Sequence, residues 1–347
     1  MKACVFYDIG DIRYEDIKKP DIKSNEVLVN VRASGICGSD ILRVYKNGTY
    51  YYPSIPGHEF SGVVVEKGKE VKKLEKGDRG AVIPLIPCGS CAFCKRGNYA
   101  QCNNYDYLGS RSNGGFAEYV AVPESNFLKI PENVTFKEAA LVEPAAVALH
   151  ALRRAEVDIG DVIAVLGAGP IGIILGKLAS LRGTKKIMLT DIIQDKLDYA
   201  EKMGFTHIFN SGKGDPVEWV KNNTERNGAD VVIEAAGVPE TFAQSILMVR
   251  KNGRITIMGN PEKDVLLSQN TVSQILRKEI NLKGTWNSRF SEYPCHEWKV
   301  IIDLLEDGKL DLKSLITHEV SFSEVNNVLE MMRDNTEFYN KVMFINE

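Results

Sequence analysis

The first part of the chain consists of short apolar runs separated by glycines and polar turns. Runs of this length and composition predict short strands rather than helices. We therefore expect a strand-rich, partly closed sheet between Met1 and about Pro131. The predicted strands are Val27 to Val31, Ser61 to Glu66, Gly80 to Pro84 and Phe116 to Val122.

From Asp161 onward the rhythm changes to an apolar strand, a glycine turn and an amphipathic helix, repeated several times. Strands that alternate with helices in this way form parallel sheets. Each of these strands is continuously apolar, so we expect both faces of the sheet to be covered. The predicted strands are Val162 to Leu166, Lys186 to Thr190, Val231 to Ala235 and Arg254 to Met258.

Helical patterns flank the parallel region. The alanine-rich stretch Glu138 to Ala155 predicts a helix that carries the chain from one domain into the next. After Gly284, the stretches Trp298 to Leu305 and Val325 to Met332 predict helices of a closing segment. A chain of 347 residues also exceeds the size of a usual single core, so we expect two domains.

Composition and charge exclude some classes of partner. With 44% hydrophobic residues, 26% charged residues and a net charge of -3, the chain has the composition of an ordinary globular protein. This slightly acidic balance argues against nucleic acid as a partner. The sequence contains neither a signal peptide nor an apolar run of the roughly 18 residues that span a bilayer. We therefore predict a cytoplasmic protein without a membrane partner.

Four cysteines lie within residues 88–102, at the spacing Cys-x2-Cys-x2-Cys-x7-Cys. Four thiolates can enclose one tetrahedral zinc ion and leave no coordination position open, which predicts a structural site. Disulfides are less favoured, because the intervals are short and nothing marks the chain as secreted. A zinc ribbon that binds nucleic acid would require a basic surface stripe, which this segment does not have. The predicted ligands are Cys88, Cys91, Cys94 and Cys102.

A glycine-rich turn follows the apolar strand Val162 to Leu166 and opens a helix. Its sequence, Gly-Ala-Gly-Pro-Ile-Gly, matches the G-x-G-x-x-G pattern of dinucleotide-binding loops, and an acidic residue ends the next strand. In such loops the glycines permit a tight turn, let a pyrophosphate approach the backbone and allow the helix to pack on the sheet. The alternative is a glycine turn in an α/β protein that binds no nucleotide. The predicted cofactor residues are Gly167, Gly169, Pro170, Ile171, Gly172 and Asp191.

The acidic residue of this pattern also predicts which cofactor is bound. Asp191 would accept hydrogen bonds from the adenosine ribose and repel a 2'-phosphate. Ile192 and Ile193 follow it, where an arginine could have bound that phosphate. The sequence therefore predicts NAD rather than NADP.

A second group of candidate metal ligands comes from two separate loops. Cys37 lies in Gly-Ile-Cys-Gly-Ser-Asp, and His58 and Glu59 follow Gly57. A thiolate, an imidazole and a carboxylate form a mixed ligand set that can leave a coordination position open for substrate. Taken singly, the three residues are better explained as a small core residue, a turn donor and a solvated charge. Their occurrence beside a dinucleotide loop and a cysteine cluster favours the metal site.

Together these motifs resemble the zinc-dependent medium-chain dehydrogenases, in the same order and over essentially the whole chain. Within that family the chain is most similar to the polyol branch, which includes the sorbitol and galactitol-1-phosphate dehydrogenases. Glutamates stand where other alcohol dehydrogenases have a second cysteine ligand. The motifs that carry the resemblance are Cys37-Gly-Ser-Asp, Gly57-His58-Glu59, the four-cysteine lobe, Glu143-Pro144 and Gly167-x-Gly169-x-x-Gly172.

The resemblance implies a two-domain α/β fold. Residues 1–150 would form a β-rich GroES-like catalytic domain that contains the structural zinc lobe 88–102. Residues 151–290 would form a Rossmann domain with a doubly wound parallel sheet, and residues 291–347 would complete the catalytic domain. The family also implies one catalytic and one structural zinc ion per subunit, NAD as cofactor, and a homodimer or homotetramer.

By the same resemblance, Cys37, His58 and Glu143 would hold the catalytic zinc, with Glu59 as an alternating or water-linked ligand. Without the resemblance, Glu143 would be taken for a surface glutamate at a helix start. Ser39 would pass on the proton that leaves the substrate. Related enzymes often have a histidine three residues after this serine, whereas this chain has a leucine there. We therefore expect the proton path to run through the cofactor ribose or water.

The resemblance also implies the reaction, which is oxidation of a secondary hydroxyl of a polyol or polyol phosphate to the ketose. Several segments resemble the galactitol-1-phosphate enzyme, and a phosphate favours fixed cationic donors. The alternative for each cation is a solvated surface side chain. Sorbitol (L-iditol), butanediol or threonine dehydrogenase, and an inactive nucleotide-binding member of the fold, are the alternative functions. The predicted substrate residues are Arg43, Lys46, Arg111 and Trp286.

Overall fold

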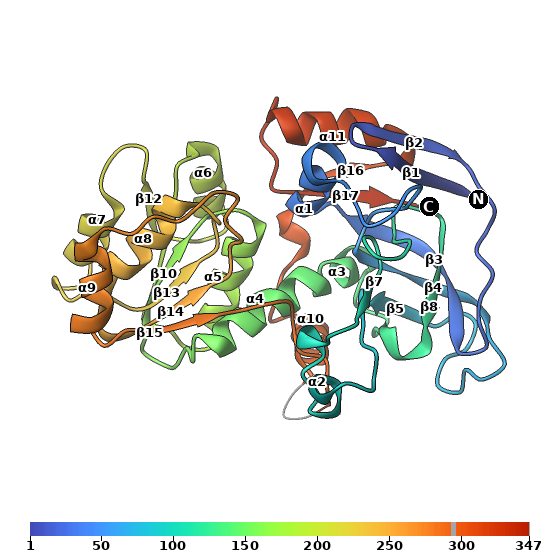
Figure 1. Ribbon diagram of the computed structural model, residues 1–347, viewed down its shortest axis with the longest axis horizontal. Coiled ribbons are helices and arrows are strands. Elements are labelled where there is room, and N and C mark those ends of the chain that lie inside the picture. Colours follow the sequence, from blue (N-terminus) through green and yellow to red (C-terminus); the bar gives the residue numbers. More distant parts are fainter. Residues whose placement is uncertain (293–295, 347) are drawn as a thin grey trace. The chain divides into compact units, whose positions relative to one another are not determined.

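The computed structural model describes residues 1–292 and 296–346, and it divides the chain into two compact units (Figure 1). The first unit combines Met1–Pro144 with Arg289–Glu347, and the second unit is Ala145–Ser288. The first unit is therefore built from both ends of the chain, and the second is inserted between them.

The second unit contains a six-stranded sheet in which every neighbouring pair is parallel. Its strand order is β12-β11-β10-β13-β14-β15, which is the order of Rossmann dinucleotide-binding domains. This confirms the predicted fold class. The strands are β10 (Val162–Leu166), β11 (Lys186–Asp191), β12 (His207–Asn210), β13 (Ala229–Glu234), β14 (Val249–Ile257) and β15 (Asn281–Gly284).

β10 and β13, two of the predicted apolar strands, lie in the middle of this sheet and are buried, as predicted. Ile163 to Leu166 of β10 and Val231 to Ile233 of β13 have no exposed surface. The pattern missed β12 and β15, because these strands lie at the edges of the sheet and are half-buried or exposed. The helices of this unit are α5 (Pro170–Leu181), α6 (Gln194–Lys202), α7 (Pro216–Asn222), α8 (Pro239–Met248) and α9 (Gln269–Arg277), together with most of α4 (Val142–Arg154), whose first three residues belong to the first unit.

The first unit contains a seven-stranded sheet that joins distant parts of the chain. The C-terminal strand β17 pairs with β3 and β16, so the last strand of the chain lies beside one of the first (Figure 1). Two-stranded ladders β1–β2 and β6–β7 lie outside this sheet. The strands are β1 (Lys2–Asp8), β2 (Asp11–Asp16), β3 (Glu26–Gly35), β4 (Glu59–Lys67), β5 (Arg79–Val82), β6 (Leu85–Ile86), β7 (Asp106–Tyr107), β8 (Tyr119–Pro123), β9 (Phe127–Lys129), β16 (Ile316–Val320) and β17 (Lys341–Ile345).

Short helices complete the first unit. The predicted helix Glu138 to Ala155 is interrupted at Leu141, which separates α3 from α4 and leaves Glu143 and Pro144 in the first turn of α4. A proline is tolerated there because its missing N–H has no intrahelical partner. The helices are α1 (Gly38–Leu42), a π-helical turn (Arg43–Asn47), α2 (Ala92–Lys95), α3 (Phe136–Ala140), α10 (Glu297–Glu306) and α11 (Val325–Asp334), with 3-10 turns at Tyr99–Gln101, Glu124–Asn126, Lys313–Leu315 and Phe322–Glu324.

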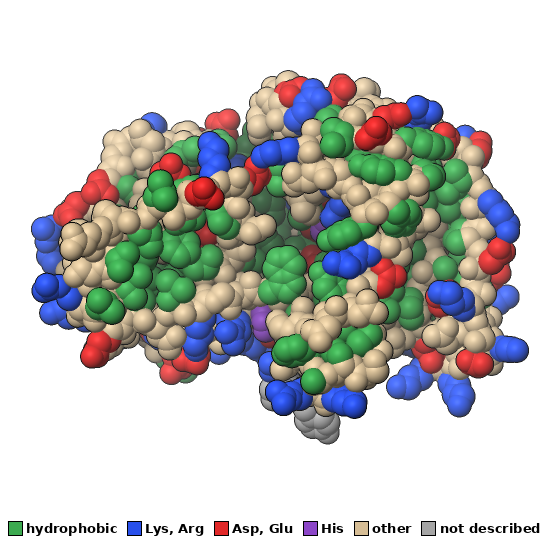
Figure 2. All heavy atoms as spheres, viewed as in Figure 1, with side chains coloured by type: hydrophobic (Ala, Val, Ile, Leu, Met, Phe, Trp, Pro, Cys, Tyr) green, Lys and Arg blue, Asp and Glu red, His purple; other side chains and the backbone are tan. Residues whose placement is uncertain are grey.

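The core of the first unit lies between its sheet and helix α11. Val29 and Val31 of β3 and Phe344 of β17 pack there with Val325 and Leu329 of α11. On the face shown in Figure 2, acidic and basic side chains are interspersed. Among the described residues, no helix is both long and apolar enough to cross a bilayer.

Candidate functional site

Cys37, His58 and Glu59 come together in the first unit. One ligand atom from each lies within 4.8 Å of the other two. Strand pairing explains this, because Gly35 at the end of β3 lies opposite Glu59 at the start of β4. Cys37 follows β3 as the N-cap residue of α1, and His58 directly precedes β4. The donors form the soft and mixed set that zinc prefers.

Asp40 organises the charges around this group. It is fully buried, and its Oδ2 accepts a hydrogen bond of 3.0 Å from the backbone N–H of Cys37. Its Oδ1 accepts a 3.0 Å bond from Arg43 Nη1 and lies 3.4 Å from His58 Nδ1. Burial alone would raise the pKa of Asp40, but His58 and Arg43 lower it. Asp40 thus remains ionised and orients the residues around it.

Burial and charge act in opposite directions on His58. Burial alone would lower its pKa, but the neighbouring Asp40 carboxylate and Cys37 side chain raise the pKa well above its usual value. An imidazole must be neutral to bind a metal, so an arriving cation would displace this proton.

A buried ion pair lies beside the same group. Lys341 Nζ of β17 contacts Glu59 Oε2 and donates a 3.0 Å hydrogen bond to the carbonyl oxygen of Ile36. Burial lowers the pKa of Lys341, but Glu59 and Cys37 raise it above its usual value, so its charge is retained.

Glu143 is also buried, but it is not among the three residues that meet within 4.8 Å. Its Oε1 accepts a 3.3 Å hydrogen bond from the hydroxyl of Tyr107, whose ring centroid lies 6.0 Å from that of His58. Burial raises the pKa of Glu143 to about 7, against the attraction of His58. The structure thus separates a close set of three donors from a fourth carboxyl group nearby.

The four cysteines of the lobe form the second cluster, and all four sulfurs lie within 4.8 Å of one another. The separations are 3.9 Å for Cys88 and Cys94, 3.5 Å for Cys91 and Cys94, and 3.9 Å for Cys91 and Cys102. A tetrahedral zinc ion with Zn–S bonds of about 2.3 Å places its sulfurs about 3.8 Å apart. The four sulfurs therefore fit a zinc ion, and none of these cysteines forms a disulfide.

Local backbone groups favour thiolates in this lobe. Cys91 is the N-cap residue of α2, and its sulfur accepts a 3.5 Å bond from the N–H of Cys94. Backbone hydrogen bonds from Cys91 and Ser90 lower the pKa of Cys88 to about 6. Burial instead raises the pKa of Cys94 to about 12, so the fourth thiolate would require the cation itself.

In the second unit the glycine loop connects β10 to α5. Gly167 has a φ of +107°, and a side chain at Gly172 would place its Cβ 1.9 Å from the carbonyl oxygen of Gly167. At Gly169, the N-cap of α5, a Cβ would meet no atom within 4 Å, which leaves the backbone there open to a ligand.

Asp191 ends β11 beside this loop. Its Oδ2 accepts a 2.9 Å hydrogen bond from the N–H of Ala168, and its Oδ1 accepts a 3.0 Å bond from Ile193. The carboxylate is therefore held in place by the loop itself. Pro170 and Ile171 form the first turn of α5.

The predicted proton-transfer and substrate residues occupy different environments. Ser39 is exposed on α1, and Lys46 is exposed on the π-helical turn. The guanidinium of Arg43 forms an ion pair with Asp40. Trp286 lies in the second unit and is 56% exposed.

Arg111 is exposed but firmly held. Its guanidinium lies 4.4 Å from the ring centroid of Tyr50 and 4.5 Å from that of Tyr105. Thr49 donates a 3.0 Å hydrogen bond to the carbonyl of Ser110, which ties the Tyr50 loop to the Arg111 loop. The guanidinium is thus fixed between two rings.

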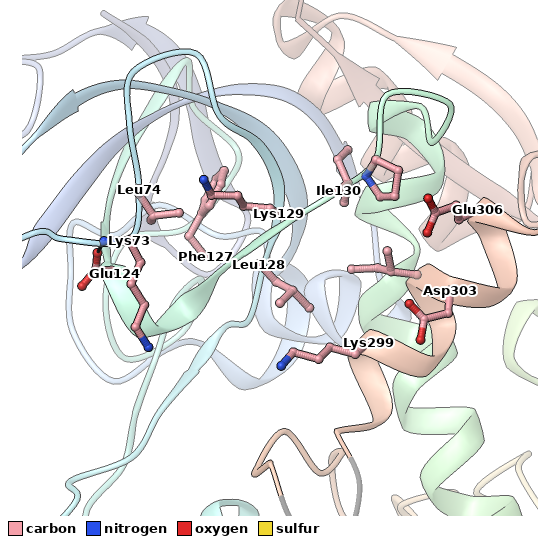
Figure 3. A pocket seen from close by; sticks show the side chains of 12 residues that line it. Lys73, Leu74, Glu124, Phe127, Leu128, Lys129, Ile130, Lys299, Asp303 and Glu306 are labelled. Carbon is pink, nitrogen blue, oxygen red and sulfur yellow. Dashed lines mark hydrogen bonds between the residues drawn. The ribbon is translucent and has the colours of Figure 1, made fainter.

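A separate hollow of about 500 Å³ in the first unit contains none of the predicted site residues (Figure 3). Leu74, Phe127 and Leu128 lie between charged side chains at its rim, including Lys73 and Glu306 (Figure 3). It is therefore distinct from both candidate metal sites.

Sequence reasoning did not identify Asp40, Tyr107 or Lys341 as members of the site. Asp40 lies in the quoted Cys37 motif, so its spacing from Cys37 could have indicated a role. The pattern around Lys341 contains no comparable signal, because its partner Glu59 lies at the other end of the chain.

Comparisons with known proteins identify the family. Residues 23–132 match the alcohol dehydrogenase GroES-like domain, and residues 170–307 match the zinc-binding dehydrogenase family. Galactitol 1-phosphate 5-dehydrogenase of Escherichia coli (strain K12) is 36% identical over 323 residues, which is 93% of each chain. The crystal structure of the Escherichia coli galactitol-1-phosphate dehydrogenase has a TM-score of 0.94 at 35% identity and covers 100% of both chains.

Of two further relatives, one is named for a different substrate and the other was solved with NADP. Sorbitol dehydrogenase of Bacillus subtilis (strain 168) is 34% identical over 95% of this chain and 93% of its own. A zinc-binding dehydrogenase from Sinorhizobium meliloti 1021, solved with NADP bound, has a TM-score of 0.92 at 30% identity and covers 99% of both chains. The chain therefore belongs to the zinc-dependent medium-chain dehydrogenases, in the branch that includes the galactitol-1-phosphate and sorbitol dehydrogenases.

Proposed function

We propose that this protein is a zinc-dependent, NAD-linked dehydrogenase that oxidises a secondary hydroxyl of a polyol or polyol phosphate to the ketose. The observation that carries the proposal is the convergence of Cys37, His58 and Glu59 within 4.8 Å, in a chain of this family. In the overall reaction the alcohol carbon loses a hydride to NAD⁺ and its hydroxyl loses a proton, which yields the ketone, NADH and H⁺.

Cys37, His58 and Glu59 would hold the catalytic ion, and Glu143, whose pKa responds to His58 and Glu59, would exchange with Glu59 or bind through water. When bound, zinc supplies Lewis acidity that lowers the pKa of a substrate hydroxyl. The four cysteines of the lobe would hold a second ion that takes no part in the reaction, because a set of four thiolates leaves no open position.

The residues of the chain orient this site and remove its proton. Asp40 orients His58 and the backbone of Cys37, and Arg43 neutralises the charge of Asp40. Ser39, exposed on α1, would accept a hydrogen bond from the substrate hydroxyl and pass its proton toward the cofactor ribose or water.

NAD would bind on the glycine loop and supply the hydride acceptor. Asp191 is already held by two backbone N–H groups, so its carboxylate would meet the adenosine ribose without rearrangement. The Sinorhizobium meliloti relative binds NADP, so the choice needs a direct measurement. We expect Asp191→Ala to lower the preference for NAD over NADP.

The substrate we favour is a polyol phosphate, and Arg111 is the residue we favour for recognition of its phosphate. Its guanidinium is held between two tyrosine rings, so little side-chain entropy remains to be lost on binding. Arg43 is a weaker candidate because it pairs with Asp40. Lys46 and Trp286 remain candidates for contacts elsewhere on the polyol.

Turnover on galactitol 1-phosphate, sorbitol, butanediol and threonine tests the proposed substrate. We expect the phosphate ester to be preferred, and Arg111→Ala to raise its KM by about tenfold or more with little effect on sorbitol. Arg96→Ala, which removes an exposed arginine from the cysteine lobe, is the matched control and should leave both KM values unchanged. Equal turnover of sorbitol and galactitol 1-phosphate would favour the sorbitol dehydrogenase alternative.

No oxidation of any of these alcohols by the zinc-loaded protein would leave the inactive nucleotide-binding alternative.

We further propose a cytoplasmic homodimer or homotetramer. Sedimentation of the purified protein would distinguish the two assemblies.

A further inference from the structure

The ammonium of Lys341 contacts Glu59, one of the three candidate metal ligands. Its side chain is 5% exposed and that of its partner Glu59 is 2% exposed. Strand β17 holds it there, since Met343 pairs with Gly35 of β3 and Lys341 donates to the carbonyl of Ile36. The ammonium therefore lies next to the segment that leads into Cys37.

The backbone makes room for this ion pair. A Cβ at Gly35 would lie 2.4 Å from Glu59 Oε2 and 3.0 Å from Lys341 Cε. Any side chain at this position would displace the pair, so the ion pair and the glycine depend on each other.

The Lys341–Glu59 ion pair also offsets negative charge beside the candidate ligands. In each of two ion pairs beside the candidate ligands a cation offsets one carboxylate: Arg43 pairs with Asp40, and Lys341 pairs with Glu59. Without Lys341, Glu59 would be a buried carboxylate without its ammonium partner, which is costly until a cation binds.

We propose that Lys341 is a positioning residue that holds one oxygen of Glu59 away from the metal and limits the affinity of the site for zinc. This inference rests on the proposed function. A carboxylate held by an ammonium competes less for the ion, which keeps a coordination position free for the substrate. Lys341 would thus lower the affinity of the site for zinc and, by keeping that position free, permit turnover.

The test is zinc affinity, measured by competition with a chelator on the full-length protein. Removal of an orienting partner usually weakens metal binding by about 10- to 100-fold. We expect the opposite for Lys341→Met, namely binding tighter by about tenfold or more, together with a lower kcat. Lys341→Arg, which keeps the charge, should remain close to the natural protein. Weaker or unchanged zinc binding in Lys341→Met would overturn the proposal.

A double variant tests whether the effect passes through Glu59. In Lys341→Met with Glu59→Gln, both charges of the pair are removed, so the gain in affinity should disappear. Lys341→Gln serves as a second neutral variant should Lys341→Met fold poorly. Arg254→Met removes the partner of Asp161 in the second unit and should leave zinc affinity unchanged. A gain that persists in the double variant would contradict the proposed role of Glu59.

The two zinc sites must be separated for this measurement. His58→Ala removes a ligand of the proposed catalytic site and identifies which chelator phase belongs to it. If the natural protein holds one zinc ion, in the cysteine lobe alone, the proposed function and this inference both fail. If it holds two and Lys341→Met does not tighten the second, only the role of Lys341 fails.

Discussion

At the scale of single residues, Asp40 shows how a residue outside the ligand set can determine its geometry. The carboxylate is fully buried and contacts the Cys37 backbone, Arg43 and His58. A buried carboxylate is stable only with such partners. Arg43 therefore has a structural role, the ion pair with Asp40, which the sequence does not indicate. This weakens the case for Arg43 as a residue that binds the substrate phosphate.

The two metal clusters should respond differently to loss of one thiol. Cys37→Ser should lower kcat by more than about a hundredfold, because even partners outside the ligand set are worth 10- to 100-fold, with a modest effect on stability. Cys91→Ser should lower the melting temperature by about 5 °C or more, because it opens the lobe. Steady-state kinetics and calorimetry of both variants check this, and a Cys91→Ser protein of unchanged melting temperature would contradict it.

At this scale, residues close in sequence could be predicted to lie together, whereas residues that only the fold brings together could not. Cys88 to Cys102 and Cys37 to Asp40 are close in sequence, so their spacing carries the geometry. Glu59 and Lys341 meet only because β17 joins β3, and neither residue has a local pattern that indicates the other. The resemblance likewise did not indicate that Glu143 would lie outside the group of the three closest donors.

At the scale of elements, the glycine loop is a case where the sequence pattern and the backbone agree. The loop is a local structure, since strand β10, the turn and α5 are consecutive, and its glycines are required by φ and by close approach. The interruption between α3 and α4 was not predicted, because an alanine-rich stretch favours an unbroken helix.

Gly172→Ala tests the close approach in this loop. Its Cβ would lie 1.9 Å from the carbonyl oxygen of Gly167, so the turn must shift. We expect the KM for NAD to rise by about tenfold or more, with little change in zinc content. Titration of NADH binding by fluorescence measures this directly. Unchanged affinity for NADH would mean that the cofactor does not depend on this turn.

At the amino-terminal ends of the inner strands of the same sheet, Asp230 joins the starts of β10, β13 and β14. Its Oδ2 accepts a 2.8 Å hydrogen bond from the N–H of Val162, and its Oδ1 accepts one from Arg250. Burial alone would raise the pKa of Asp230, but Val162 and Arg250 lower it below the usual 3.8. A lowered pKa stabilises the fold above pH 3.8 and loses this contribution as the pH falls through the lowered value.

Asp230→Asn should therefore cost about 1 kcal/mol at neutral pH and much less in acid. Melting temperatures of the two proteins, measured from pH 7 to the lowest pH at which both fold, should converge as the pH falls. Glu225→Gln, an exposed change in the same unit, is the control and should leave the curve unchanged. A constant difference at all pH values would show that the charge of Asp230 contributes nothing.

At the scale of the whole molecule, the first unit is closed by the last strand. In β17, Val342, Met343 and Phe344 are fully buried, and each such side chain contributes about 1.5–3 kcal/mol. Together they are comparable to the total stability of a domain, which is about 5–15 kcal/mol. The two-unit arrangement of the fold follows from family resemblance, whereas the dependence on β17 required the strand pairing.

Deletion of residues from Lys341 onward should destabilise the first unit and remove the catalytic zinc. Metal content per chain would show this as a loss of about one ion, and circular dichroism would show loss of strand structure. Phe344→Ala is a milder variant and should lower stability by about 3–5 kcal/mol. A truncated chain that retains both ions and its melting temperature would contradict the assignment of β17 to the core.

The position of β17 also has a consequence for biosynthesis. The second unit, Ala145–Ser288, leaves the ribosome before β16 and β17 are made, so it can fold while the first unit is still incomplete. Cys37, His58 and Glu59 are synthesised before the second unit, whereas Lys341, whose ammonium contacts Glu59, is synthesised after it. Until β17 docks, Glu59 would therefore lack its ammonium partner and be more open to a divalent cation.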